Sequence, residues 1–215
     1  TQKEKSVGYN EKNYNNIFGV SLTIVEMGHN PQVAVFEIGT NAFGEVRDLT
    51  RIVEPDISAI TNVRPAHLEG LKSTLGVLNE KLDIFRYTKE DGTILINRDD
   101  ESIRTFKDER RKILYFGIKN PGDFSLSVKR VCGWDGYEVI LNLRGEVLET
   151  KTKLLGFHNL YNVLLAASIS HLLGISKDKI KEGIEEFGSY PMRMHPRRSP
   201  KGYTILDDTY NANPS

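Results

Sequence analysis

The chain has 215 residues, and 39% of them are hydrophobic, which is enough for a packed core in one large domain or two small ones. Basic and acidic residues both number 29, so no net charge draws the chain to nucleic acid or to an anionic membrane. One cysteine, Cys132, excludes an internal disulfide framework, and no apolar run is long enough for a membrane span. We expect a cytoplasmic protein.

A strand, a helix and a second strand are expected in the first quarter of the chain. Residues 32–38 and 56–63 are short runs rich in β-branched residues, typical of buried parallel strands. Residues 44–54 between them have helical spacing, and Pro55 stops that helix. This order is typical of a parallel sheet with crossover helices.

The alternation continues with a helix at 74–87 and a strand at 92–97, and then a charged connection, expected to be helical, before a strand at 112–116. We therefore predict an α/β fold with a mainly parallel sheet flanked by helices on both faces.

The pattern changes after Asn120. Three segments alternate apolar and polar residues around glycine-containing turns, which predicts an antiparallel β-meander appended to the sheet. Two helices and a last strand are expected after it. In order, the three meander segments, two helices and strand are 125–130, 137–143, 146–154, 159–173, 177–187 and 203–206.

Glu37 is an acid at the end of an otherwise apolar strand, where a buried carboxylate needs water, a cation or hydrogen-bond donors. An acid that simply faces solvent is an equal alternative. The neighbouring Gly39, Thr40 and Asn41 supply a close backbone and polar groups, which favours a Mg²⁺ or phosphate role.

His67 follows the second strand at an expected helix start, where it could face the same crevice as Glu37. Lys81 lies beside the apolar stripe of the 74–87 helix. The ordinary alternatives are a hydrogen-bonded structural histidine and a lysine whose stem packs on the core while its amine reaches solvent. The functional hypothesis is an amine that acts near His67.

Three polar residues, His158, Asn159 and Asn162, open an apolar helix. Asn159 could simply cap this helix. Together the three side chains also suit a purine and a ribose, through amide hydrogen bonds and ring stacking.

Asp207 and Asp208 follow the last expected strand, where paired carboxylates suit a ribose or a metal, although turn chemistry also favours aspartate there. Arg193 is either a phosphate clamp or a surface arginine, since Arg197 and Arg198 lie nearby.

Five segments in this order resemble the central ATP-binding domain of the Mur ligases, most closely the D-alanyl-D-alanine-adding subfamily. The match covers nearly the whole chain, and the first two segments favour this subfamily. The five segments are Asn13–Val20, Glu37–Glu45, Thr61–Gly70, Gly156–Asn162 and Asp207–Pro214.

The resemblance implies a role for each matching residue. It places Glu37 on the Mg²⁺ that bridges the ATP phosphates, and His67 and Lys81 on a second Mg²⁺, with Lys81 carbamylated so that it becomes an anionic oxygen ligand. The remaining positions would contact the nucleotide. They are His158, Asn159 and Asn162 near the adenine, Arg193 near the γ-phosphate and Asp208 near the ribose.

The implied reaction is ATP-dependent formation of an amide bond. ATP phosphorylates the carboxylate of a UDP-N-acetylmuramoyl peptide, and the amine of D-alanyl-D-alanine attacks the acyl phosphate. A monomer is expected. The alternatives are a folylpolyglutamate- or cyanophycin-type ligase, against which Gly39–Asn41 with Gly44 and Glu45 argues, and a non-catalytic nucleotide-binding module.

Two departures from the family pattern concern the phosphate site. No Gly-x-x-x-x-Gly-Lys-(Ser/Thr) run occurs in the 215 residues. His195 stands where the family usually places an acid, two residues after Arg193. The chain also starts without methionine. We therefore expect a truncated central domain at 1–208, with an antiparallel insert at about 124–155 and a linker at 209–215, that is inactive as an isolated fragment.

Overall fold

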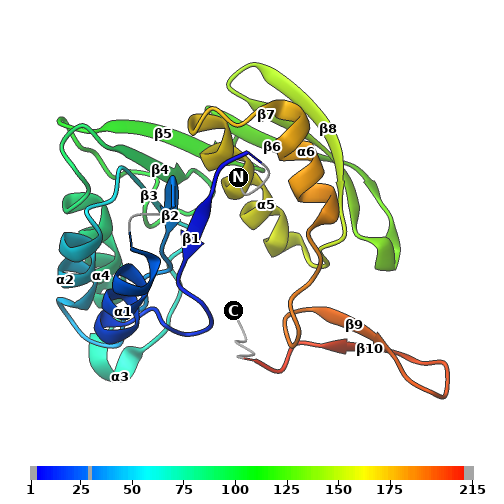
Figure 1. Ribbon diagram of the computed structural model, residues 1–215, viewed down its shortest axis with the longest axis horizontal. Helices are drawn as coiled ribbons and strands as arrows, with labels where there is room; N and C mark the ends of the chain where they lie inside the picture. The colour runs from blue at the N-terminus through cyan, green and yellow to red at the C-terminus, as the bar shows by residue number, and fades with distance from the viewer. Residues whose placement is uncertain (1–3, 29–30, 211–215) are drawn as a thin grey trace. The chain divides into compact units, whose positions relative to one another are not determined.

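Most of the expected elements are present in the computed structural model, which describes residues 4–28 and 31–210. The chain divides into two units, Thr1–Tyr115 and Phe116–Ser215. Strands with covering helices occur in both, as Figure 1 shows, so the predicted fold class is confirmed. The expected domain boundary at 208 stays a prediction, and residues 211–215 of the expected linker lie outside the described residues.

Parallel strand pairing dominates the first unit. In the main sheet, β3 (Ile57–Ile60) pairs in parallel with β4 (Thr93–Asn97). A separate parallel pair joins β1 (Val7–Tyr9) to β2 (Val33–Val35). The helices of this unit are α1 (Ile17–Met27), α2 (Glu45–Val53), α3 (Leu68–Leu71) and α4 (Thr74–Arg86).

The strand expected at 32–38 is shorter and more exposed than the sequence indicates. β2 covers only Val33–Val35, and the side chain of Val35 is 48% exposed. The prediction of a buried strand was wrong because β2 pairs with β1 in a two-stranded sheet, outside the sheet that contains β3. Glu37 consequently lies in the loop after the strand rather than at its end.

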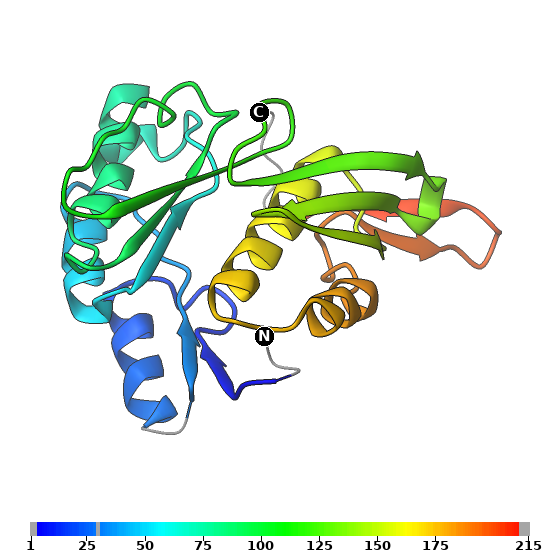
Figure 2. The ribbon, with the colours of Figure 1, turned by 90° about the horizontal axis from the view of Figure 1, so that it is seen from above.

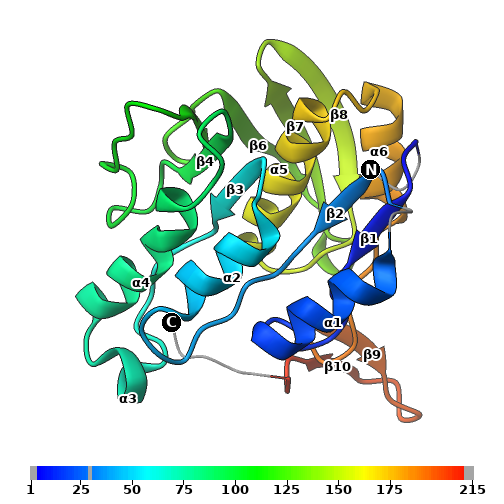
Figure 3. The same ribbon diagram turned by 60° about the vertical axis from the view of Figure 1, so that its left-hand side comes forward.

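Helix α4 forms the centre of the first unit's core. It begins at Ser73, whose hydroxyl accepts a hydrogen bond from Gly76 N at 3.1 Å, as expected for an N-cap. Val77 and Phe85 are fully buried and pack in one cluster with Ile94 and Ile96 of β4. Figure 3 shows α1, α2 and α4 side by side, and α2 contacts both of the others.

The charged connection between β4 and the next strand, β5 (Lys112–Gly117), consists of turns, so the helix expected there was wrong. Two aspartates explain the difference. Asp100 accepts from Ser102 N at 2.9 Å, and Asp108 accepts from Arg110 N and Arg111 N at 2.9 and 2.8 Å. Aspartate side chains that bond to nearby backbone amides in this way compete with helical hydrogen bonds.

The second unit contains the predicted meander. β5 (Lys112–Gly117) begins in the first unit, and its end pairs in parallel with β6 (Phe124–Val131). β6 then pairs antiparallel with β7 (Tyr137–Leu143), which pairs antiparallel with β8 (Glu146–Thr152). Helices α5 (Phe157–Leu172) and α6 (Lys177–Glu186) pack on this meander, as Figure 2 shows.

A hairpin ends the described part of the second unit. The expected last strand is β10 (Thr204–Asp207), and it pairs antiparallel with β9 (His195–Arg198), which the sequence did not indicate. β9 contains a proline at position 196, which weakens a strand pattern but is tolerated on an edge strand.

Replacing Phe85 with alanine should lower the free energy of unfolding by about 3–5 kcal/mol, because the buried ring leaves a cavity. Phe85 is fully buried and lies 5.2 Å from the ring of Phe106. Urea unfolding followed by circular dichroism measures the effect. The control is Phe18→Ala, at a side chain 84% exposed, which should change stability by less than about 0.5 kcal/mol. Equal losses at both positions would contradict this account of the core.

Candidate functional site

Two asparagines hold Glu37 in the loop after β2. Asn10 bonds to both backbone groups of Glu37, since its Oδ1 accepts from Glu37 N at 2.8 Å and its Nδ2 donates to Glu37 O at 2.9 Å. Asn15 Nδ2 donates to the Glu37 carboxylate at 3.1 Å. The carboxylate is therefore oriented by a neutral amide while its residue remains exposed, which leaves it accessible to a cation.

The next turn, Thr40–Gly44, is organised by the Glu45 carboxylate. Its Oε2 accepts from Asn41 N at 2.6 Å and from Ala42 N at 3.1 Å. These hydrogen bonds hold the pKa of Glu45 below its usual value, and the bond from the Asn41 amide has the largest effect. Burial acts in the opposite direction. The negative charge also lies at the start of α2, where the helix dipole favours it.

Three side chains hold the short loop after β3, residues 61–63. Asn97 Nδ2 donates to Thr61 O at 2.7 Å, and Asp100 Oδ2 accepts from Val63 N at 2.7 Å. Between them, Lys81 Nζ donates to Asn62 O at 2.9 Å. The backbone of this loop is thus fixed by side chains from β4, the following turn and α4.

Lys81 is partly buried, and this burial lowers the pKa of its amine below the usual value for lysine. The carboxylate of Asp100 acts in the opposite direction. A lower pKa makes the neutral, nucleophilic form of this amine more populated than in an exposed lysine. The Lys81 amine is hydrogen-bonded to the carbonyl of Asn62, so the alternative of an amine that reaches only solvent does not describe it.

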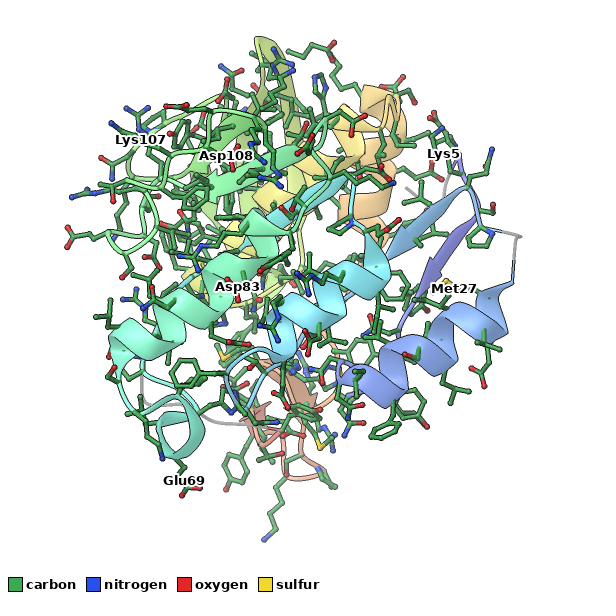
Figure 4. The ribbon with its side chains drawn as sticks, turned by 90° about the vertical axis from the view of Figure 1, so that its left-hand side faces the viewer. Lys5, Met27, Glu69, Asp83, Lys107 and Asp108 are labelled. Atoms are coloured by element: carbon green, nitrogen blue, oxygen red, sulfur yellow. The ribbon has the colours of Figure 1, made fainter. Side chains whose placement is uncertain are left out.

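His67 precedes the short helix α3 and has a left-handed backbone, with φ 52°. It lines a hollow of about 370 Å³ together with Asn41, Leu68, Glu69 and Gly70. Figure 4 shows Glu69 projecting from α3. A carboxylate, an imidazole and an amide thus border one hollow on the first unit.

Gly70 allows α3 to approach the turn before α2. A Cβ atom at Gly70 would lie 1.8 Å from the carbonyl oxygen of Asn41, which is too close for any side chain at this position. This close approach lies at the border of the hollow beside His67, which Asn41 and Gly70 both line.

Within residues 4–28 and 31–210, no three His, Cys, Asp or Glu side chains form a group that could hold a metal ion. A Mg²⁺ ion at Glu37 or His67 would therefore take further ligands from a modified Lys81, from phosphate oxygens or from water, as Mg²⁺ commonly does.

In the second unit, helix α5 begins two residues earlier than expected. Its N-cap is Gly156, so the alternative that Asn159 caps the helix was wrong. Asn159 Nδ2 instead donates back to Leu155 O at 2.7 Å, and its Oδ1 accepts from Asn162 Nδ2 at 3.0 Å. The two asparagines form one connected pair on the first turn, with the exposed His158 beside them.

Arg193 and Asp208 both have partners at the base of the β9–β10 hairpin. Asp208 Oδ1 accepts from Met194 N at 3.0 Å, and Tyr210 N donates to Met192 O at 3.1 Å. The guanidinium of Arg193 lies over the ring of Tyr210, 4.4 Å from its centroid, a cation–π contact. The hairpin therefore places each of these predicted site residues next to a residue close in sequence to the other.

The predicted site residues consequently fall into two groups, one in each unit. Glu37, His67 and Lys81 lie on or against the loops after β2 and β3 of the first unit. The second unit contains the other five, in the α5 turn and at the hairpin base. Sequence reasoning missed the orienting role of six residues. Two of them, Asn15 and Glu45, lay within recognised segments, and the signal of the others was a polar side chain among apolar or loop positions. The six residues are Asn10, Asn15, Glu45, Glu80, Asn97 and Asp100.

Comparison with known proteins identifies the family. A family model described as the Mur ligase middle domain matches residues 1–170. The chain belongs to the Mur ligase family. The resemblance drawn from the five sequence segments is therefore confirmed.

Similar Mur ligases match nearly the whole chain and are about twice as long. The UDP-N-acetylmuramoyl-tripeptide–D-alanyl-D-alanine ligase of Haemophilus influenzae is 31% identical over 211 residues, which are 97% of this chain and 45% of that protein. The ligase of the same name from Escherichia coli is 31% identical over 95% of this chain and 46% of that protein. The chain thus spans about half the length of the curated Mur ligases that it matches.

Solved structures show the same fold. MurF ligase from Thermotoga maritima in complex with ADP has a TM-score of 0.88 and 25% identity, over 99% of this chain and 49% of that chain. MurF from Acinetobacter baumannii also has a TM-score of 0.88, at 24% identity, over 99% of this chain and 47% of that chain. No helix in the described part of this Mur ligase chain is long and apolar enough to cross a membrane.

Replacing Gly70 with alanine should destabilise this Mur ligase chain by roughly 1–3 kcal/mol, because the new methyl group must displace the carbonyl of Asn41. Thermal unfolding measures the change. The control is Gly183→Ala on α6, where nothing lies within 4 Å of the new Cβ. Alanine should stabilise that helix by up to about 1 kcal/mol. Effects of the same sign at both positions would refute the close approach at Gly70.

Proposed function

We propose that the protein containing this chain is an ATP-dependent ligase that joins D-alanyl-D-alanine to a UDP-N-acetylmuramoyl tripeptide. The observation that carries this proposal is the match, at 31% identity over 97% of this chain, to a ligase named for these two substrates. The proposal includes a cytoplasmic location, a monomeric enzyme and no nucleic-acid partner. The even balance of charge and the single cysteine support it.

The first unit supplies the proposed metal ligands. Glu37 would hold the Mg²⁺ that bridges the ATP phosphates, and His67 and Lys81 would hold a second one. The donor set fits Mg²⁺ when Lys81 is carbamylated, since a carbamate adds an anionic oxygen where an ammonium would repel the cation. Held by these residues, Mg²⁺ would supply positive charge to compensate the negative charge of the transferring phosphoryl group.

The environment of Lys81 supports its carbamylation. Burial lowers the pKa of the amine, so the neutral form that reacts with carbon dioxide is more populated than in an exposed lysine. The amine nitrogen forms a bond to the carbon of carbon dioxide and loses one proton to solvent, and the product is a carbamate. The hydrogen bond to Asn62 O shows that the amine reaches the loop that leads to His67.

The second unit supplies the proposed nucleotide contacts. His158, Asn159 and Asn162 would contact the adenine, and Asp208 the ribose. Arg193 would orient the γ-phosphate, and its cation–π contact with Tyr210 supports a fixed guanidinium position. The complex of the Thermotoga maritima relative with ADP supports nucleotide binding by this fold.

In the proposed reaction, the tripeptide carboxylate attacks the γ-phosphorus of ATP, and ADP leaves. The amine of D-alanyl-D-alanine then attacks the acyl phosphate, an amide bond forms, and inorganic phosphate and a proton leave. The protein contributes mainly by positioning the reactants and by compensating charge, as in other phosphoryl transfers.

The full-length protein should release ADP and phosphate only when ATP, Mg²⁺, the UDP-N-acetylmuramoyl tripeptide and D-alanyl-D-alanine are all present. Mass spectrometry of the product should show the tripeptide extended by the dipeptide. Parallel reactions with a folate and glutamate, and with a polyaspartate and arginine, test the rival ligases. Turnover with either rival pair, or none with any substrate, would overturn the proposal.

Replacing Lys81 with arginine should reduce turnover by about a hundredfold or more, because arginine retains the positive charge but forms no carbamate. The control is Lys89→Arg, at an exposed lysine paired with Asp56, which should retain wild-type turnover. Isotopically labelled bicarbonate should give a carbamate signal in the wild type that is absent in Lys81→Arg. An active Lys81→Arg enzyme would contradict the proposed role.

A further inference from the structure

Glu80 is a buried acid that precedes Lys81 on helix α4. Its residue is 2% exposed, and it lies three positions after the fully buried Val77 on the inward side of the helix. Burial of a carboxylate in a core costs free energy unless hydrogen bonds compensate for the lost water. The partners of Glu80 therefore indicate what this acid does.

These partners lie on another element, at the start of helix α2. Glu80 Oε2 accepts from Gly44 N at 2.7 Å, and Oε1 accepts from Val46 N at 2.8 Å. Gly44 is the N-cap of α2 and provides no side-chain cap of its own. The Glu80 carboxylate therefore satisfies two of the first amides of α2, whose backbone has no partners within the helix there.

The Glu80 carboxylate also borders the turn that leads into α2. Thr40 Oγ1 lies 3.3 Å from Glu80 Oε1 and 3.3 Å from Glu45 Oε2. Glu45 in turn accepts from the amide of Asn41, which lines the hollow beside His67. Glu80 and Glu45 thus hold the two ends of the Thr40–Val46 segment.

Adjacent residues of α4 therefore fix both loops of the candidate metal site. Glu80 holds the Thr40–Val46 segment, which follows Glu37, and Lys81 holds the carbonyl of Asn62, in the loop that leads to His67. Successive residues on an α-helix point about 100° apart, so one rigid turn can hold two different loops.

We propose that Glu80 is a positioning residue, which fixes the Thr40–Val46 segment relative to Lys81 and so sets the spacing of the Mg²⁺ ligands. This inference rests on the proposed function, because it concerns the metal site of that reaction. Glu80 itself touches neither metal nor substrate. It acts through the backbone of α2 and through its neighbour on α4.

The test compares Glu80→Ala and Glu80→Gln in the full-length protein with the control Thr88→Val. Thr88 is as buried as Glu80 and lies just past the C-terminal end of α4. Its hydroxyl donates to Ile84 O at 2.7 Å and lies 2.7 Å from Ser58 Oγ. The control therefore loses buried hydrogen bonds of the same helix without touching the Thr40–Val46 segment.

Amide hydrogen exchange is the first readout and needs no enzyme activity. Glu80→Ala should raise the exchange rates of the Gly44 and Val46 amides at least about tenfold above those of Thr88→Val, the factor expected from one lost hydrogen bond. Glu80→Gln has one acceptor oxygen in place of two, so it should protect one of the two amides and expose the other.

The Mg²⁺ concentration that gives half-maximal ATP-dependent ligation is the second readout. It should rise in Glu80→Ala, rise less in Glu80→Gln and stay at the wild-type value in Thr88→Val. If Glu80→Ala matches Thr88→Val in both exchange and Mg²⁺ requirement, Glu80 only stabilises the fold and the inference is wrong.

The two readouts separate this inference from the proposed function. A wild-type protein without ligase activity contradicts the proposed function, while the exchange rates still decide whether Glu80 holds the segment. An active wild type whose Gly44 and Val46 amides exchange normally in Glu80→Ala supports the ligase and overturns the positioning role.

Discussion

The loops after β2 and β3 depend on side-chain hydrogen bonds, several of which come from helix α4 and strand β4. Both loops contain residues of the candidate site. The Lys81 amine on the Asn62 carbonyl is the central contact, because it joins the helix to the loop before His67. Since α4 is anchored in the core by Val77 and Phe85, the core also determines where these loops lie.

This arrangement links the chemistry of Lys81 to its structural role. The burial that lowers the pKa of the amine arises from the same packing that places it beside the loop. Asp100 fixes the Val63 amide and also favours the charged form of Lys81, so it moderates the effect of burial. The reactivity of the amine is therefore a balance between one packing effect and one electrostatic effect, both set within the first unit.

Helices and strands with a clear hydrophobic period, and the family's short motifs, could be recognised from the sequence. Contacts between segments far apart in the sequence could not. The stripes of α2 and α4 and the alternation of β6–β8 predicted those elements because each contains its own signal. Helix α1 was missed because Asn13–Val20 was considered only as a motif, and the turns after β4 were missed because their aspartates bond locally. Lys81 was recognised by its neighbours in sequence. Glu80 was not, because its partners lie more than thirty residues away.

The hairpin base in the second unit joins two points of the chain that are distant along the backbone. Asp208 is bonded to the amide of Met194, and the amide of Tyr210 to the carbonyl of Met192, so the residues on either side of Arg193 are tied to the strand that leaves the hairpin. A force applied to the chain at Tyr210 is therefore transmitted to Arg193 and its neighbours through these contacts, as well as along β9 and β10. The connection between Arg193 and the end of the described chain thus does not depend on the hairpin strands alone.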